Sequence, residues 1–432
     1  MTETALPLPV DGSGRVERMR AGLKRRHARE TRFRLYGLLA IGVAVGFLLL
    51  LLGRIVEQGH SAFYGHSVTV PVYLDPARID PTYPQGTNFE LLAAEQALTR
   101  LGVADDAAGA KSRAMRALFS SELKFIAADR VEAEPALIGR TVRIVAPLSD
   151  DADLYFKGEI SRDTPEAQRR LSDEQIAWLD RMRADGQIES RFNSALFARG
   201  DSTEPELAGV LGAVVGSSLM LLVTAVIALP LGVAAALYLE EFAPRGRLTD
   251  LIEVNINNLA AVPSILYGLL GLAVFINWMH LPRASPLVGG LVLALMALPT
   301  IIIATRASLK AVPPSIRQAA LAMGASKTQT VFHHTLPLAM PGVMTGAIIS
   351  MAHALGETAP LLLIGMVSFV PGVSLGLTEA GGALPSLVYI WENASERAFH
   401  ERTAAAILVL LAFMVVMNGA AVLLRRRFER RW

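Results

Sequence analysis

Cysteine is absent from the 432 residues of this chain, and charged residues make up only 19% of it. The absence of cysteine excludes disulfides, a thiolate nucleophile and cysteine ligands for a metal. Aromatic residues are also few, at 6%, whereas hydrophobic residues reach 52% and the mean hydropathy is +0.40. This much apolar surface exceeds the need of one soluble core, so the composition indicates an integral membrane protein.

Motifs for chemistry are missing as well. The stretch "GASKTQT" around Lys327 lacks the Gly-x-x-x-x-Gly-Lys-[Ser/Thr] spacing of a phosphate-binding loop. His333 and His334 are adjacent and do not share a helix face, and no nearby Cys, Asp or Glu completes a metal set. We therefore expect no catalytic residue, no metal site and no cofactor bound by this chain.

Apolar runs suited to a lipid bilayer recur along the sequence. A spanning helix needs about 20 apolar residues. Six runs approach this length, at residues 35–53, 207–239, 259–282, 284–305, 341–356 and 403–424. The first run starts too deep in the chain for a signal peptide and no small-residue cleavage site follows it, so we expect an anchor.

Lys and Arg gather toward the two ends of the sequence. Residues 15–34 hold nine Lys or Arg against two Glu, and residues 425–432 hold five Arg against one Glu. Because basic residues flank spans on the cytoplasmic side, we expect both ends inside, which requires an even number of spans. Six spans satisfy this and also place the four basic side chains of residues 306–327 inside.

Two segments fit this topology less simply. Residues 240–253, "EEFAPRGRLTDLIE", are expected to form an inside loop but carry more acid than base, although acidic residues weigh little in the rule. The apolar segment 361–370 would move the C-terminal arginines outside if it crossed the membrane. We expect it to be a packed or re-entrant segment that follows the break at Pro360.

Residues 54–206 have the composition of a soluble domain. The stretches "HSVTVPVYLD" and "RTVRIVAPL" predict strands, and "FELLAAEQALTRL" and "DTPEAQRRLSDEQIAWLDRMRADG" predict amphipathic helices. Asp163 or Thr164 is expected to be the N-cap of the second of these helices, with Pro165 at its first helical position. The topology makes this an extracytoplasmic α+β domain. Without a nucleotide, metal or catalytic pattern, we interpret it as an accessory or docking domain, with a ligand sensor as the alternative.

Residues 317–342, "RQAALAMGASKTQTVFHHTLPLAMPG", are too polar and small-sided for a span. Pro314 suits the first turn of a helix, Gly324 permits a break, and Ser326 can cap a second short helix that a Leu-Pro pair ends. Two short cytoplasmic helices with small side chains suit a docking knob for a cytosolic partner. The alternative is an ordinary loop lying at the membrane interface.

The same stretch resembles the "EAA" coupling loop of ABC importer permeases: Glu-Ala-Ala, three residues, Gly, nine residues, Ile, one residue, Leu-Pro. The positions of this chain that align with the pattern are Gln318, Ala319, Ala320, Gly324, Leu336 and Pro337. Gln318 replaces the acid and His334 replaces the aliphatic residue. The resemblance implies that this loop seats in a groove of a separate ATPase and carries its closing motion to the spans.

Three separated blocks narrow the resemblance. "PLGVAAALYLEEFA", "NNLAAVPSILYGLLGLAVF" and "GETAPLLLIGMVSFV" resemble, in order, the PstA-type permease of phosphate ABC importers over roughly residues 207–432. This implies the type I ABC importer permease fold and one half of a hetero-dimeric pore that moves inorganic phosphate inward across the bacterial inner membrane. The implied partners are a PstC-type permease, a cytoplasmic PstB-type ATPase dimer that uses the ATP, and a periplasmic PstS-type binding protein. Residues 54–206 resemble, by their position in the chain, the insertion domain found in one branch of these permeases.

The motif "AHALGETAP" marks a candidate substrate pathway. Glu357 interrupts apolar sequence, where a charge is costly unless it is paired or hydrated. His353 lies four residues earlier, so the two share a helix face and a protonated His353 could pair with Glu357. PstA-type permeases often carry Arg at the position of His353. We assign His353, Glu357 and Thr358 to the pathway; the alternative is packing and hydrogen bonding around the break at Pro360.

The sequence thus predicts a mostly α polytopic membrane protein with six transmembrane helices, the type I ABC importer permease fold and an α+β extracytoplasmic insertion domain. The predicted divisions are a basic segment 1–34, a span 35–53, the domain 54–206, a permease domain 207–424 with coupling loop 306–340, and a basic tail 425–432. A permease for sulfate, molybdate or phosphonate is an alternative. A receptor that uses residues 54–206 as a sensor is another, although no inside segment is long enough for a signalling domain.

Overall fold

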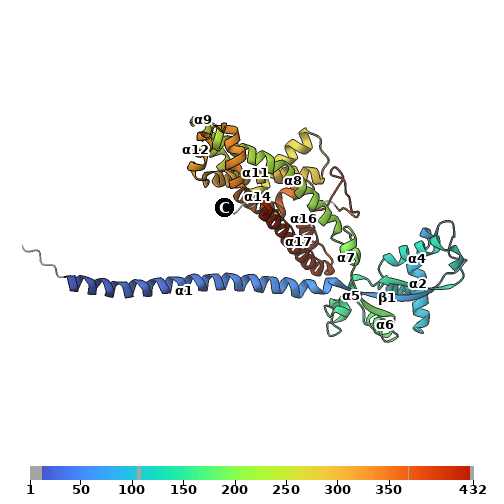
Figure 1. The fold of residues 1–432 in the computed structure, drawn as a ribbon. Helices are drawn as coiled ribbons and strands as arrows, with labels where there is room; N and C mark the ends of the chain where they lie inside the picture. Colours follow the sequence, from blue (N-terminus) through green and yellow to red (C-terminus); the bar gives the residue numbers. More distant parts are fainter. Residues whose placement is uncertain (1–11, 105–108, 368, 429–432) are drawn as a thin grey trace, which may run out of the picture. The chain divides into compact units, whose positions relative to one another are not determined.

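The structure is a computed structural model that describes residues 12–104, 109–367 and 369–428 (Figure 1). The chain divides into two compact units, Met1–Glu57 and Gln58–Trp432. Within the described residues the first unit is helical and belongs to α1 (Gly12–Gly59). The predicted first span, residues 35–53, lies inside this helix, whose candidate membrane-crossing part is His27–Phe63.

Residues 64–198 of the second unit form a small α+β region, called here the sheet domain. Its antiparallel sheet has the order β2-β1-β3, with β1 (Tyr64–Tyr73) in the centre between β2 (Thr141–Pro147) and β3 (Ile188–Phe192). The register pairs Val70 with Ile144 and Tyr64 with Phe192. Among its described residues, the helices that accompany the sheet are α2 (Phe89–Arg100), α3 (Ala110–Arg116), α4 (Glu122–Ala133), α5 (Asp150–Lys157), α6 (Asp173–Ala184) and α7 (Ala195–Ala198).

Alternation of buried and more exposed side chains along the strands explains why the sheet forms where the sequence predicted it. Along β1, Val68, Val70 and Val72 are buried, and they share one core with residues of the helices such as Phe89 and Trp178. The strands in "HSVTVPVYLD" and "RTVRIVAPL" and the helix in "FELLAAEQALTRL" are confirmed.

The cap predicted for the longer helix of this domain is wrong. Pro165 precedes only a single 3-10 turn, Glu166–Gln168, and α6 starts at Asp173. Ser172 caps α6 through a reciprocal capping box with Gln175, whose two hydrogen bonds are 3.2 and 2.9 Å long. The box satisfies two backbone donors, whereas neither Asp163 nor Thr164 caps a helix.

Residues 207–428 form a bundle, called here the helical domain. Its longer helices are α8 (Leu211–Leu237), α9 (Arg247–Ala260), α11 (Pro286–Lys310), α14 (Leu336–Gly356) and α17 (Ala398–Phe428). The shorter ones are α10 (Ser264–Gly271), α12 (Pro314–Ala322), α13 (Lys327–Gln329), α15 (Ala359–Leu363) and α16 (Leu384–Glu392). The π-helical segments η6 (Tyr238–Phe242), η7 (Leu272–Trp278) and η8 (Thr330–Thr335) continue neighbouring helices.

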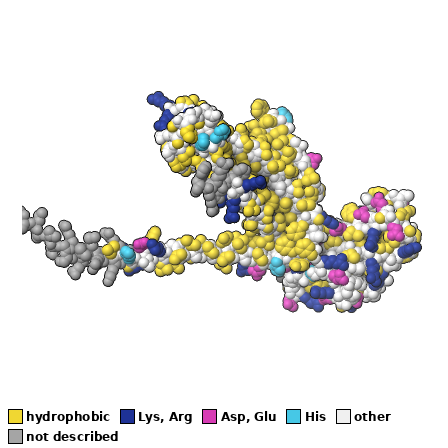
Figure 2. Space-filling view, viewed as in Figure 1, with side chains coloured by type: hydrophobic (Ala, Val, Ile, Leu, Met, Phe, Trp, Pro, Cys, Tyr) yellow, Lys and Arg dark blue, Asp and Glu magenta, His cyan; other side chains and the backbone are white. Residues whose placement is uncertain are grey.

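Five helices of the described chain are long and apolar enough to cross a membrane, and a bent pair brings the number to six. In Figure 2, apolar side chains cover much of the helical domain and α1, while charged side chains gather on the sheet domain. A few buried polar contacts tie the bundle together. Thr224 of α8 donates to the Gly290 carbonyl of α11 at 3.0 Å, and Ser350 of α14 donates to the Ala297 carbonyl at 3.3 Å.

The third predicted span, residues 259–282, is not one straight helix. Arg247–Ala260 and Ser264–Trp278 meet at an angle of 100°. Pro263 stands at this break, where its ring and missing N–H prevent a continuous helix. The inside loop expected at residues 240–253 is therefore largely helical, since it contains the end of η6 and the first half of α9. The segment 361–370 holds the end of α15 and turns; Ser368 lies outside the described residues.

Candidate functional site

The predicted docking knob corresponds to residues 314–335, from α12 to η8. Gly324 follows α12 with φ +87°, a left-handed conformation that favours glycine. Ser326 then caps α13 in a capping box with Gln329, with hydrogen bonds of 3.2 and 2.9 Å. The break at Gly324 and the cap at Ser326 are therefore confirmed as local geometry.

The end predicted for the second knob helix is wrong. Helix Lys327–Gly356 runs without interruption through Leu336 and Pro337. The wider π-helical turns of η8 come directly before the proline, and there they accommodate its ring and the backbone hydrogen bond that it cannot donate. The predicted fifth span, residues 341–356, is only the second half of this helix. One helix of 30 residues, about 45 Å long at 1.5 Å per residue, thus connects the knob with residue 356.

The six predicted coupling residues do not form one surface. Gln318, Ala319 and Gly324 are exposed, whereas Ala320 is buried and Leu336 and Pro337 are half-buried in the long helix. Two apolar side chains that the prediction omitted, Leu321 and Met323, are 51% and 78% exposed. The knob therefore presents an apolar tip that could contact a partner.

An arginine of α12 forms an ion pair with η6, the segment that continues α8. Arg317 Nη2 lies 2.7 Å from Glu241 Oε1, and the same guanidinium donates to the carbonyls of Val312 and Leu309 at 2.9 Å. The side chains of Arg317 and Glu241 are 23% and 9% exposed. This pair is the contact that sequence reasoning missed at the knob.

The second acid of the same segment also has basic partners. Glu240 Oε2 lies 3.5 Å from Arg306 Nε and 3.7 Å from Lys310 Nζ. The excess of acid in residues 240–253, which fitted poorly with an inside loop, is thus offset by basic residues of α11 and α12. A charge count along the sequence does not show this, because the partners are more than 60 residues away.

The predicted pathway residues come together at the other end of the long helix. His353 Nε2 lies 3.2 Å from Glu357 Oε1, and the side chains are 67% and 19% exposed. Glu357 ends α14, and Thr358 directly precedes α15. Buried Ala354 and Leu361, on either side of this break, share one core with residues of α10 and α11. The expected pair is formed, and its role in transport remains a prediction.

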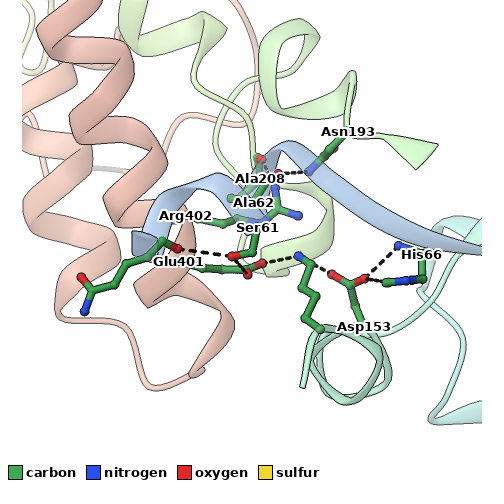
Figure 3. Close-up of polar contacts among 10 residues, drawn as sticks. Ser61, Ala62, His66, Asp153, Asn193, Ala208, Glu401 and Arg402 are labelled. Carbon is green, nitrogen blue, oxygen red and sulfur yellow. Dashed lines mark hydrogen bonds and ion pairs between the residues drawn. The ribbon is translucent and has the colours of Figure 1, made fainter. Parts of the chain in front are cut away.

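A third polar cluster joins the sheet domain to the start of α17 (Figure 3). Lys157 Nζ lies 2.7 Å from Asp153 Oδ2 and 2.6 Å from Glu401 Oε1. Ser61 donates to Glu401 Oε2 at 2.8 Å, and both the backbone N–H and Nδ1 of His66 lie 2.8 Å from Asp153 Oδ1. We call these five residues the junction.

The junction is buried, and its one lysine faces two carboxylates, so its charges balance only together with the neighbouring Arg402. Lys157, Asp153 and Glu401 have side chains 8%, 11% and 9% exposed. The next residue, Arg402, is 4% exposed and donates to the Ala208 carbonyl at 2.9 Å. Burial alone would raise the pKa of Asp153, but hydrogen bonds from His66 and the charge of Lys157 hold it below its ordinary value.

Sequence reasoning missed the junction because its members lie far apart. Lys157 and Glu401 are separated by 244 residues. The one available signal was a charged pair, Glu401 and Arg402, placed directly before the apolar run 403–424. Such a pair indicates that a partner is needed but does not identify it. The partners are known only from the fold, which places α5 and the segment after α1 beside Glu401.

Two family models match the chain. The model described as "Binding-protein-dependent transport system inner membrane component" matches residues 228–430, and a "Domain of unknown function (DUF3333)" matches residues 20–166. The second model covers most of α1 and most of the sheet domain, and its description assigns no activity.

Curated relatives match about half of the chain. The "Phosphate transport system permease protein PstA 1" of Mycobacterium tuberculosis (strain CDC 1551 / Oshkosh) is 33% identical over 234 residues, which are 54% of this chain and 76% of that protein. The PstA protein of Mycobacterium leprae is 32% identical over 52% of this chain and 73% of its own length. A solved structure of the MetNI methionine ABC transporter covers 51% of this chain and 95% of its own, with 20% identity and a TM-score of 0.40.

Proposed function

The chain belongs to the PstA family of phosphate transport system permeases, and from this premise we infer that it carries inorganic phosphate across the inner membrane as the permease subunit of an ABC importer. The observation that supports this most is the 33% identity over 76% of a phosphate permease. We propose that ATP is hydrolysed by a PstB-type ATPase dimer, that a PstC-type permease completes the pore, and that a PstS-type protein delivers phosphate. The chain then needs no cofactor of its own.

In this proposal the ATPase binds the docking knob. The exposed Leu321 and Met323 offer it apolar contact, and Arg317 holds α12 against η6 through Glu241. A displacement of the knob would be passed to the helix Lys327–Gly356 because the second half of the knob, residues 327–335, is the first part of this helix.

The far end of that helix carries the proposed pathway. Glu357 bears a charge that repels phosphate unless it is paired, and His353 lies within 3.2 Å of it. A protonated His353 would neutralise the carboxylate and add a donor for an oxyanion, and Thr358 adds a hydroxyl beside them. Rotation or translation of the long helix would then change how these groups face the pathway.

Radiolabelled phosphate uptake tests the proposed substrate. The chain, co-purified with its partner permease and ATPase and reconstituted into proteoliposomes with the binding protein, should accumulate phosphate only with ATP. Unlabelled phosphate should compete, and sulfate, molybdate and phosphonate should not. Competition by one of those anions at equal concentration would assign the alternative substrate.

Two variants test the pathway. Glu357→Gln keeps shape but removes the charge, and we expect altered uptake with normal insertion. His353→Arg fixes the positive charge, so uptake should persist with a flatter pH response between about pH 5.5 and 8. Unchanged rates and pH profiles in both variants would assign the pair to packing.

Gly324→Val tests the knob. A β-branched residue at φ +87° costs about 1–2 kcal/mol and disturbs the turn, so ATPase binding and uptake should fall while the protein still inserts. Gly419→Val is the matched control, since no atom lies within 4 Å of a Cβ added there and its φ is not positive. Normal uptake by Gly324→Val would count heavily against the assignment.

We further propose that both termini are cytoplasmic and that the sheet domain is extracytoplasmic. Reporter fusions test this. A reporter inserted within residues 105–108 should be active only outside, and one fused after residue 432 only inside. The opposite pattern would reverse the topology.

A further inference from the structure

Four aromatic rings form a continuous ladder where the sheet domain meets the helical domain. Phe63 and Phe197 stack at 5.9 Å between ring centroids, and Phe197 stacks on Phe192 at the same distance. Tyr64 meets the edge of Phe192 at 6.2 Å. The ladder joins the segment after α1, the end of β3 and the short helix α7.

One end of the ladder is anchored and the rest is open. Phe63 packs against a core formed by residues such as Leu384 and Trp391 of α16. Beyond it, Phe197, Tyr64 and Phe192 are 41%, 55% and 58% exposed. Single exposed apolar residues are common, but a contiguous aromatic patch marks an interaction surface.

Contacts with α17 indicate the level of this patch in the membrane. Ser61 donates to Glu401 at 2.8 Å, and Glu401 lies two residues before the apolar run 403–424. Gly59 lies so close to α17 that an added Cβ would be 2.9 Å from the backbone of Ala404. The segment just before Phe63 is therefore level with the point at which α17 enters the apolar layer.

We propose that the ladder of Phe63, Tyr64, Phe192 and Phe197 lies in the lipid headgroup layer on its side of the membrane and rests the sheet domain on that surface. Aromatic rings favour this layer because they combine apolar faces with a polar edge or hydroxyl. The basic groups nearest in sequence already have partners, since Arg191 pairs with Glu189 and Arg199 with Glu122. The contact is thus mainly apolar and needs no particular lipid charge.

The absence of cysteine makes a direct test possible, because each single-cysteine variant takes one spin label. The variants are Phe192→Cys and its neighbour Arg191→Cys, whose side chain leaves the opposite face of β3. Leu222→Cys, 57% exposed on α8, is the reference for the membrane interior. The labelled chain is reconstituted with its partner subunits in liposomes, and collision of the label with oxygen and with a water-soluble nickel chelate is measured.

We expect the oxygen-to-nickel ratio at residue 192 to be several-fold higher than at residue 191 and lower than at residue 222. Equal ratios at 191 and 192 would overturn the proposal, because the ladder would then face water. A label at 192 shielded from both colliders would also overturn it and would identify a protein partner on the ladder.

A second pair guards against a folding defect in Phe192→Cys. Tyr64→Cys, with Gly65→Cys as its control, places the label on β1, where Tyr64 pairs with Phe192 and Gly65 with Arg191. No atom lies within 4 Å of a Cβ added at Gly65. The same ordering of ratios is expected, with 64 above 65. The collision ratios do not depend on which anion the permease transports. The membrane contact of the ladder and the proposed function can therefore be refuted independently of each other.

Discussion

The docking knob and the junction both join a short segment to a long helix through an ion pair with a buried carboxylate, and they differ in the exposure of the cation and in the number of its partners. At the knob, one arginine that is 23% exposed holds one glutamate. At the junction, Lys157 is 8% exposed and lies between two carboxylates, which are themselves bonded to Ser61 and His66. A pair in contact with water can yield and re-form, whereas loss of one member of a buried network leaves a charge without solvent or partner. We therefore expect the knob to move and the junction to stay rigid.

The largest effect should follow from removing the centre of the junction. Lys157→Ala leaves Asp153 and Glu401 buried without their cation, which costs about 3–5 kcal/mol in the free energy of unfolding. Thermal unfolding of the purified protein would measure this. The control is Lys111→Ala, whose ion pair with Glu174 is at the surface at 3.6 Å and should matter by less than about 1 kcal/mol. Equal losses in the two variants would remove the distinction between the regions.

A pH effect of intermediate size is expected next to the junction. Glu206 lies in the turn Pro205–Leu207 before α8, and burial raises its pKa from 4.5 to about 7. Between these values the folded chain binds more protons than the unfolded chain, so the stability from this group is fully present below about pH 4.5 and is lost as the pH rises through about 7.

Glu206→Gln should remove this pH dependence and raise stability by up to about 3 kcal/mol above pH 7. The measurement is the unfolding midpoint between pH 5 and 8, with the exposed Glu132→Gln as control. A wild-type midpoint that rises over this range, or a Gln variant with the wild-type slope, would contradict the assignment.

The smallest effect on stability should occur at the knob. Arg317→Gln loses the 2.7 Å contact with Glu241, and because the pair reaches solvent we expect a loss of about 1–2 kcal/mol. Uptake should fall more than stability does, since the variant detaches the knob without unfolding the bundle. A variant that transports at the wild-type rate would show that this ion pair has no part in coupling.

Local patterns in the sequence predicted the elements of both regions but not their contacts. Gly324 and Ser326 determine the backbone within a few residues, so the turn and the cap could be read directly, as could β1 from its alternating valines. Pro337 was misread because its effect depends on η8, a widened helical segment that no local pattern predicts.

The spacing of His353 and Glu357 was predictable because a helix fixes the distance between residues four apart. The contacts of Lys157 with Glu401 and of Arg317 with Glu241 were not, because these partners lie 244 and 76 residues away and only tertiary packing brings them close. The sequence also contains many other Lys, Arg, Asp and Glu, so charge type alone does not select the partner.

In the proposed mechanism one continuous helix, Lys327–Gly356, connects the docking knob with the proposed phosphate pathway. A double change of Ile348 and Ile349 to glycine would place a flexible point between the docking knob and Glu357, near Gly346, while the same change to alanine keeps the helix and removes similar side-chain volume. The direct measurement is the amount of phosphate transported per ATP hydrolysed by the reconstituted complex. We predict that the glycine variant assembles and hydrolyses ATP but transports several-fold less phosphate per ATP than the alanine variant. Equal ratios in the two variants would contradict the account.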